Sequence, residues 1–181
     1  IDERNSKNET VEFNFIGIEK SEIVKQSMRL YTDKTKFCKE VVVTEDILED
    51  QIYSLHKTCD CFITISHGEA WSIPAFDAMA FGNTPICSNE GGPKDFIDAS
   101  DTNTGSLIDG VYNVCNCPDA AFPHIFTGRE EWFCPSESQT KKAMRYYYEN
   151  RDNIDRSAGL KQAEKFSYEK IGTKIKEYLG E

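Results

Sequence analysis

Residues 61–92 read CFITISHGEAWSIPAFDAMAFGNTPICSNEGG and contain a strand, a helix and a second strand in succession. The nearly continuous apolar run of residues 61–65 predicts a strand that is buried on both faces of a parallel sheet. Residues 74–81 predict a helix, because Pro74 suits a first turn, and residues 84–87 predict the next strand. Strands that alternate with helices at this spacing are typical of an α/β fold with a parallel sheet.

The same alternation extends in both directions along the chain. Residues 11–16 alternate apolar and polar side chains and end at Gly17, as a strand that runs into a turn does. Further strands are predicted at residues 41–43 and 106–108, and further helices at residues 22–31 and 49–57. We therefore predict a single Rossmann-like domain over residues 1–181, built on a doubly wound parallel sheet.

The C-terminal third follows a different pattern. Residues 110–135 show no clear periodicity and are predicted to form a long irregular insertion. Ser136 and Gln139 have the spacing of a capping box, which predicts a helix that runs to about Asn150. Residues 166–168, FSY, then lead into a last helix, where apolar side chains recur at helical spacing: Tyr168, Ile171, Ile175 and Tyr178.

The composition is that of a folded acidic protein. The 181 residues carry a formal net charge of −10, which argues against nucleic-acid binding, because such proteins neutralise phosphates with basic patches. Residues 141–181 are the exception, with ten Lys or Arg against seven Asp or Glu. Solvated helix faces explain this excess better than contact with an acidic surface or with anionic lipid. No apolar run approaches the ~18 residues of a membrane span, and no signal peptide is recognisable.

Seven cysteines raise the question of a metal site. Cys115 and Cys117, with Cys134 downstream and His124 as a candidate fourth ligand, lack the usual spacing of a zinc-binding pair. We therefore expect no metal, no cofactor, and a reduced protein of the cytoplasm. Three other cysteines lie in or beside predicted strands, where small buried thiols are common: Cys59, Cys61 and Cys87.

Two acids flank the start of the predicted helix at residues 74–81. Glu69 lies in the loop before it, and Asp77 lies about one turn inside it. Ligands of open parallel sheets bind beyond the carboxyl ends of the strands, where this loop is expected. The free amides near Trp71, Ser72 and Ile73 point outward at the positive end of the helix dipole, which favours a phosphate. As isolated acids, the two residues are also compatible with a solvated loop carboxylate and a dipole partner.

This stretch resembles the retaining glycosyltransferases of the GT-B fold, in the class called group 1 or family 4. Their C-terminal domain carries S-x-x-E-G-F-G-L-P-x-x-E-A-M-A-x-G-x-P-V-I-x-S-x-x-G-G, and residues 66–92 of this chain read SHGEAWSIPAFDAMAFGNTPICSNEGG. Residues 48–60 resemble the helix before the buried strand, and residues 105–107, GSL, resemble a later G-x-L strand. Residues 166–169, FSYE, resemble the F-S-W-E start of the final helix. The resemblance covers about residues 41–109 and 136–181.

The resemblance implies a domain that is one half of a GT-B fold and binds a nucleotide-diphosphate sugar as donor. Glu69 would contact the transferred sugar as the catalytic residue, and Asp77 would hold the ribose hydroxyls. Thr44 would lie near the base, and Lys20 is a candidate contact for the diphosphate. The transfer would retain the anomeric configuration with help from the donor phosphate and without a metal. The backbone amides that would contact the sugar or the distal phosphate belong to Ala70, Trp71, Ser72 and Ile73.

The chain departs from the family pattern in ways that leave some roles open. Asp77 replaces the usual glutamate and shortens that arm by one methylene, and residues 70–72, AWS, replace G-F-G. Trp71 either lines the sugar pocket or packs at its rim. Lys20 is either a ligand or a solvated lysine at a helix start. His67 matches no catalytic position of the family, so we expect a surface or hydrogen-bonded structural role for it.

A complete GT-B enzyme has a second domain that binds the acceptor, and the resemblance places no such domain here. The chain starts at Ile1 without a methionine, so we expect a fragment or a processed product that is inactive alone. Its partners would be the donor, the missing N-terminal domain and an acceptor glycan, lipid or protein, with the complete enzyme cytoplasmic or peripheral to a membrane. Two alternatives stay open: a non-catalytic nucleotide-sugar-binding module, and a GT-B-fold epimerase of UDP-sugars.

Overall fold

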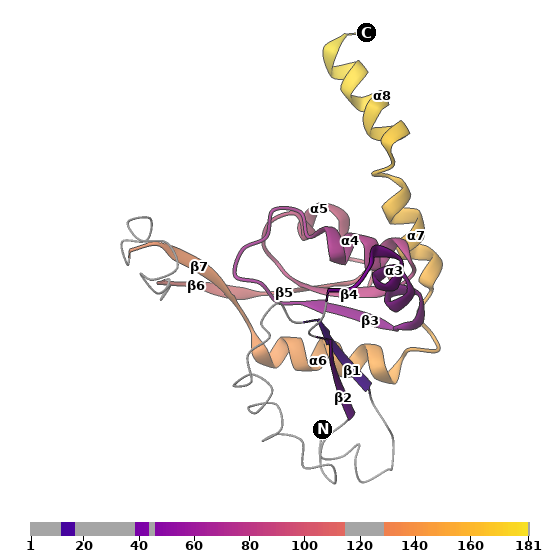
Figure 1. The fold of residues 1–181 in the computed structure, drawn as a ribbon. Coiled ribbons are helices and arrows are strands. Elements are labelled where there is room, and N and C mark those ends of the chain that lie inside the picture. Colours follow the sequence, from indigo (N-terminus) through magenta and orange to yellow (C-terminus); the bar gives the residue numbers. More distant parts are fainter. Residues whose placement is uncertain (1–11, 17–38, 44–45, 115–128, 181) are drawn as a thin grey trace. The chain divides into compact units, whose positions relative to one another are not determined.

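The computed structural model describes residues 12–16, 39–43, 46–114 and 129–180 (Figure 1). The chain divides into two compact units, residues 1–48 and residues 49–181, which are taken in turn. The prediction of a single domain over the whole chain stays a prediction.

The first unit contains two parallel strands. β1 (Glu12–Ile16) pairs with β2 (Lys39–Val43), with Glu12 opposite Lys39 and Ile16 opposite Val43. Both predicted strands are thereby confirmed. The helix predicted at residues 22–31 lies outside the described residues.

The second unit is built on three parallel strands in the order β3, β4, β5. β3 (Cys61–Thr64) and β5 (Ser106–Ile108) lie on either side of β4 (Thr84–Ser88). α3 (Glu49–Thr58) precedes β3, and α4 (Ile73–Ala80) connects β3 to β4. The helices and strands predicted between residues 49 and 108 are confirmed, and with them the α/β fold.

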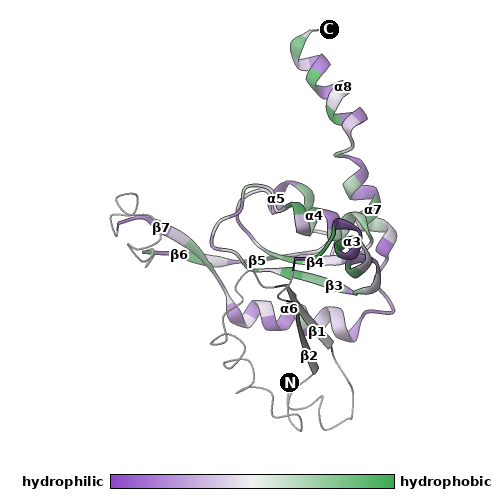
Figure 2. Cartoon of the chain, viewed as in Figure 1, coloured by the Kyte–Doolittle hydropathy of each residue, from purple (hydrophilic) through white to green (hydrophobic). Residues whose placement is uncertain are grey.

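The strand that is buried along its whole length is β4, not β3. All five residues of β4 are buried, whereas Ile63 of β3 is 39% exposed. The expectation that residues 61–65 are buried on both faces is therefore wrong. β4 is the more buried strand because it has a partner strand on each side and helices on each face. β3 lies at one edge of the three-stranded sheet. Apolar residues concentrate on this sheet and on α4, while α6 is largely hydrophilic (Figure 2).

The core has two clusters because successive residues of β4 point to opposite faces of the sheet. Cys87 belongs to a cluster with α4, α5 (Pro93–Phe96) and α7 (Arg156–Glu164), and Ile86 to a cluster with β5 and α6 (Glu137–Glu149). Helices thus cover both faces, as expected for a doubly wound sheet (Figure 1).

Residues 110–135 include a hairpin that was not predicted. β6 (Gly110–Val114) pairs antiparallel with β7 (Glu131–Pro135), so the expectation of an irregular insertion is wrong for these two segments. Two aromatic residues, Tyr112 and Phe133, lie opposite each other across the ladder, and such cross-strand pairs favour strand pairing. Residues 115–128 lie outside the described residues.

Three helices close the chain. Ser136 caps α6 by accepting a hydrogen bond from the Gln139 amide (3.4 Å), which confirms the predicted start of that helix. α7 was not predicted, although Asp155 caps it through the Ser157 amide (3.0 Å). α8 (Tyr168–Leu179) was predicted and begins at its cap Ser167.

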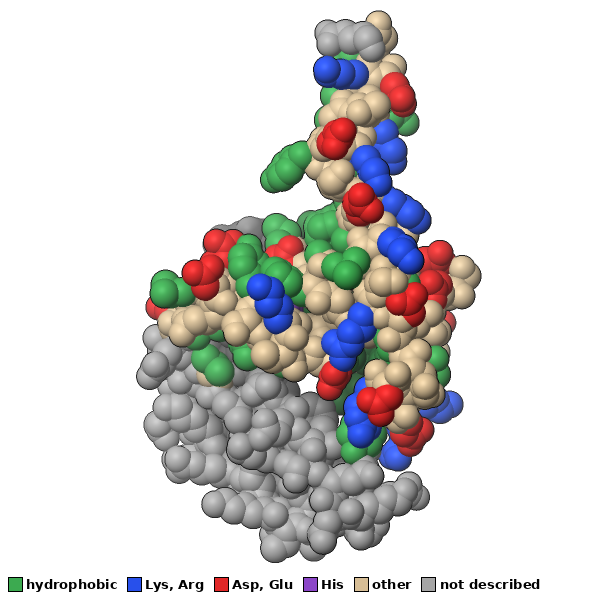
Figure 3. All heavy atoms as spheres, turned by 90° about the vertical axis from the view of Figure 1, so that its right-hand side faces the viewer, with side chains coloured by type: hydrophobic (Ala, Val, Ile, Leu, Met, Phe, Trp, Pro, Cys, Tyr) green, Lys and Arg blue, Asp and Glu red, His purple; other side chains and the backbone are tan. Residues whose placement is uncertain are grey.

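α8 is amphipathic and exposed. It has no buried residue, and Tyr168 and Tyr178 are 100% and 92% exposed. Lysine and apolar side chains are both visible along it (Figure 3). Within the described residues, no helix combines the length and the apolar character that crossing a membrane requires.

Candidate functional site: the loop between β3 and α4

Three loops leave the sheet at the carboxyl ends of β3, β4 and β5, which lie at one edge because the strands are parallel. Hydrogen bonds connect these loops. The Ser88 hydroxyl donates to the Ser66 carbonyl (2.6 Å), and the Asn89 amide donates to the Ile108 carbonyl (2.8 Å). The Asn89 side chain also donates to the Asp109 carboxylate (2.7 Å). The candidate site is therefore built on a connected set of loops.

The loop after β3, residues 66–72, rests directly on the Gly91–Gly92 turn. A Cβ on Gly91 would overlap the Glu69 carbonyl oxygen, and one on Gly92 would overlap the Ala70 carbonyl oxygen. Gly91 also has φ +68°, and the Gly92 amide donates to the Ala70 carbonyl (3.0 Å). Only glycine permits this approach, so the pair of glycines sets the position of the backbone that carries Glu69.

Glu69 is half-buried at the centre of this loop. Its Oε1 accepts a hydrogen bond from the Ala70 amide (3.1 Å), so that amide is already engaged. Burial, with a smaller contribution from the Glu69 charge, raises the pKa of the buried Cys87 thiol to about 12. Glu69 therefore lies within electrostatic reach of the end of β4.

The start of α4 is shaped by an unusual backbone conformation. Ser72 occupies the N-cap position in the left-handed region, with φ 63° and ψ 64°, and its side chain makes no capping bond. Its carbonyl accepts the amides of Ala75 and Phe76, both at 3.0 Å. Pro74 has no N–H, and Ile73 is the first helical residue, so the first turn presents the Ile73 amide without a partner inside the helix.

Asp77 lies about one turn inside α4 and is half-buried. Burial raises its pKa, the nearby His56 opposes this shift, and Glu49 adds to it. Both neighbours belong to α3, whereas Glu69 influences Cys87 at the end of β4. The two acids therefore have different electrostatic surroundings.

Trp71 packs into an aromatic cluster. Its ring lies 5.8 Å from Phe76 and 5.3 Å from both Phe96 and Phe166, measured between ring centroids. The structure shows that this side chain packs, and a role in lining the sugar pocket stays a prediction. The sequence could not decide this, because two of the three partners are distant along the chain. The cluster joins the loop to α4, α5 and the segment before α8.

His67 has the hydrogen-bonded role expected for it. Its Nδ1 lies 2.7 Å from the Phe133 carbonyl oxygen, and the Phe133 amide donates to the His67 carbonyl (3.1 Å). Its ring stacks on Trp132, with centroids 4.0 Å apart and planes at 10°. Both partners belong to β7, which was not predicted, so no sequence signal pointed to this contact.

Two predicted donor contacts, Thr44 and Lys20, lie outside the described residues, as do Cys115, Cys117 and His124. Cys134 is a free cysteine of β7. Among the residues that the structure describes, no group of three or more His, Cys, Asp or Glu is arranged to hold a metal ion.

The chain belongs to the group 1 glycosyl transferases, whose family model matches residues 3–114. In fold, it is similar to the pneumococcal O-GlcNAc transferase GtfA, solved in complex with UDP and GlcNAc, with a TM-score of 0.59 and 17% sequence identity. That similarity covers 99% of this chain and 30% of the other, so the chain spans less than a third of that transferase. The likeness agrees with a Rossmann-like half of a GT-B fold. No protein with a curated description matches the chain.

Proposed function

We propose that the chain is the C-terminal, donor-binding domain of a retaining glycosyltransferase of the family 4 class, with residues 1–181 forming one domain. It would bind a nucleotide-diphosphate sugar, from which the complete enzyme transfers a hexose to an acceptor. One observation carries the proposal: the loop with Glu69 is held on the Gly91–Gly92 turn at the carboxyl edge of the sheet, directly before α4. This is where open parallel sheets bind ligands.

Different residues of this loop contact different parts of the donor. Glu69 contacts the transferred sugar, and the amide of Ile73, with those of Ala70, Trp71 and Ser72, contacts the sugar or the distal phosphate. The positive end of α4 favours the phosphate charge. For Ala70, this requires the Glu69 carboxylate to leave its amide when the donor binds.

The remaining contacts lie further along the donor. Asp77 accepts hydrogen bonds from the ribose hydroxyls, Thr44 lies near the base, and Lys20 approaches the diphosphate. The donor phosphate assists both departure of the leaving group and attack by the acceptor, and no metal takes part. The acceptor is bound by a further N-terminal domain, so this chain alone is inactive. We place the enzyme in the cytoplasm or peripherally at a membrane surface.

Calorimetry with UDP, GDP and their sugars tests the proposal. We expect the chain to bind one of these donors, and Glu69→Ala and Asp77→Ala each to weaken that binding about tenfold or more, because each removes a charged hydrogen-bonding group. Asp152→Ala, which changes an exposed acid in the turn before α7, is the control and should bind like the unchanged chain. A folded chain that binds none of these ligands would contradict the proposal.

A further inference from the structure

On either side of Gly68, the loop that carries Glu69 is attached to its surroundings. The Ser66 carbonyl is held by Ser88, and the backbone of Glu69 and Ala70 rests on the Gly91–Gly92 turn. Within the part of the chain that the structure describes, nothing lies within 4 Å of the place where a Cβ of Gly68 would be. The attachment that remains, at His67, is made by β7.

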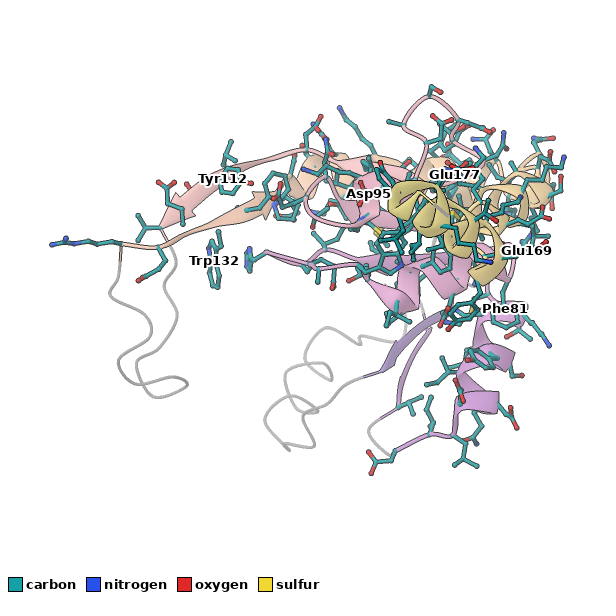
Figure 4. The ribbon with its side chains drawn as sticks, turned by 90° about the horizontal axis from the view of Figure 1, so that it is seen from above. Phe81, Asp95, Tyr112, Trp132, Glu169 and Glu177 are labelled. Atoms are coloured by element: carbon teal, nitrogen blue, oxygen red, sulfur yellow. The ribbon has the colours of Figure 1, made fainter. Side chains whose placement is uncertain are left out.

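His67 is attached through three contacts at once. The Phe133 carbonyl can only accept, so Nδ1 of His67 must carry the proton of that 2.7 Å hydrogen bond. The Phe133 amide returns a hydrogen bond to the His67 carbonyl (3.1 Å), and the imidazole lies flat on Trp132. Trp132 lies between β7 and the tip of this loop (Figure 4).

β7 is itself held by side-chain packing and by a hydrogen bond at the base of the hairpin. Phe133 is 6% exposed, and its ring contacts Tyr112 of β6 edge to face, with centroids 5.6 Å apart. At the base of the hairpin, the Ser136 amide donates to the Asp109 carbonyl (2.8 Å), directly after β5. His67 therefore connects the loop to an element that continues from the sheet.

We propose that His67 is a positioning residue that fastens the Glu69 loop to β7, so that the β6–β7 hairpin helps to set affinity for the sugar part of the donor. This rests on the proposed function. His67 lies two residues before Glu69, and among the described residues the space beside Gly68, between them, is open. Without His67, the upstream side of Glu69 would be free as far as Ser66, and its carboxylate would lose a defined position relative to the sugar.

Three variants separate the contacts. His67→Ala removes the side-chain hydrogen bond and the stack, whereas His67→Asn keeps a side-chain N–H donor close to the place of Nδ1. Trp132→Ala removes the stack alone. Val114→Ala is the control, because Val114 is a 51% exposed residue of the same hairpin that lies opposite Glu131.

The first measurement is hydrogen exchange of the free chain, followed in peptides that cover residues 66–72 and 131–135. We expect His67→Ala to speed exchange most in both peptides. Trp132→Ala and His67→Asn, which each lose the stack but keep a hydrogen bond to β7, should speed it less, and Val114→Ala should resemble the unchanged chain. Unchanged exchange in His67→Ala would overturn the proposal, whatever the chain binds.

The second measurement is the ratio of the affinities for UDP-GlcNAc and for UDP, with GDP-mannose and GDP as a second pair. We expect His67→Ala to weaken binding of the nucleotide sugar about tenfold and of the nucleotide about twofold or less, and His67→Asn to restore most of the loss. An equal loss for both ligands would mean a general structural role and would overturn the proposal. If the unchanged chain binds neither pair, the proposed function fails, and the exchange measurement alone decides the attachment.

Discussion

Ser72 is the only non-glycine residue with positive φ in the described part of the chain. The family pattern has glycine at this position, and a left-handed conformation costs an L-residue about 1–2 kcal/mol. Ser72 therefore adopts the left-handed backbone conformation that glycine adopts easily, although serine has a Cβ that makes this conformation costly. Ser72 is 4% exposed and next to Trp71, whose aromatic cluster holds the segment in place.

We expect Ser72→Gly to raise the free energy of unfolding by about 0.5–1 kcal/mol, because relief of the strained backbone exceeds the added entropy of the unfolded chain. Urea unfolding measures this. Ser136→Gly is the matched control and should lower stability, since Ser136 caps α6 through its hydroxyl. A loss of more than ~1 kcal/mol in Ser72→Gly would show instead that the hydroxyl makes a stabilising contact.

We expect the Asp77 carboxylate to lower the stability of the folded chain while it strengthens donor binding. Burial raises its pKa, so the folded state holds this proton more tightly than the unfolded state. Its charge therefore disfavours folding at neutral pH, and that penalty fades as the pH falls through the raised pKa, above about 4. We expect Asp77→Asn to raise Tm at pH 7 while weakening donor binding, and Asp152→Asn to change neither. A lower Tm in Asp77→Asn would mean that the carboxylate makes a favourable contact.

At the scale of elements, α3 is joined to α4 and β3 through His56. Its ring lies 5.6 Å from Phe62 and 6.0 Å from Phe81, and its carbonyl accepts a hydrogen bond from the Asn83 side chain (2.6 Å). The side chain is buried, and its Nε2 has no hydrogen-bond partner among the described residues. Burial lowers the pKa of His56, against a weaker opposing effect from Asp77.

The lowered pKa of His56 predicts a loss of stability in mild acid. The unfolded state takes up this proton more readily, so the contribution is complete above about pH 6.5 and declines as the pH falls below it. We expect Tm to decrease from pH 7 to pH 5, and His56→Phe, which keeps an aromatic ring at the site, to flatten that decrease. The same slope in both proteins would show that other groups control it.

The elements that the sequence predicted well are those whose pattern is local. The β-branched run of β2, the proline at the start of α4 and the cap at Ser136 each act within a few residues. The β6–β7 hairpin was missed because each strand is stabilised by the other, across residues 115–128. α7 was missed although Asp155 is a good cap, since its short apolar side, with Gly159 and Ala163, has meaning only against Met79 of α4.

At the scale of the whole molecule, the family of the chain is known from its sequence. The fold was predicted from the sequence and is also seen in the structure. The group 1 match and the parallel α/β fold agree with each other. The chain spans 30% of the transferase that it resembles in fold. Under the proposed function, donor binding is the part of the reaction that can be tested on this chain alone.

The sequence by itself determined the alternation of helices and strands around the parallel sheet, the family, and the loop on which Glu69 lies. The reason is that periodicity, caps and glycine pairs are features of short stretches of sequence. Only the tertiary structure decided that Trp71 packs among aromatic rings, that β4 is the buried strand and that His67 is attached to β7. These contacts join residues far apart in the chain, and their geometry depends on how the elements pack. The side chains around the proposed donor loop are therefore set by packing, although the loop itself is visible in the sequence.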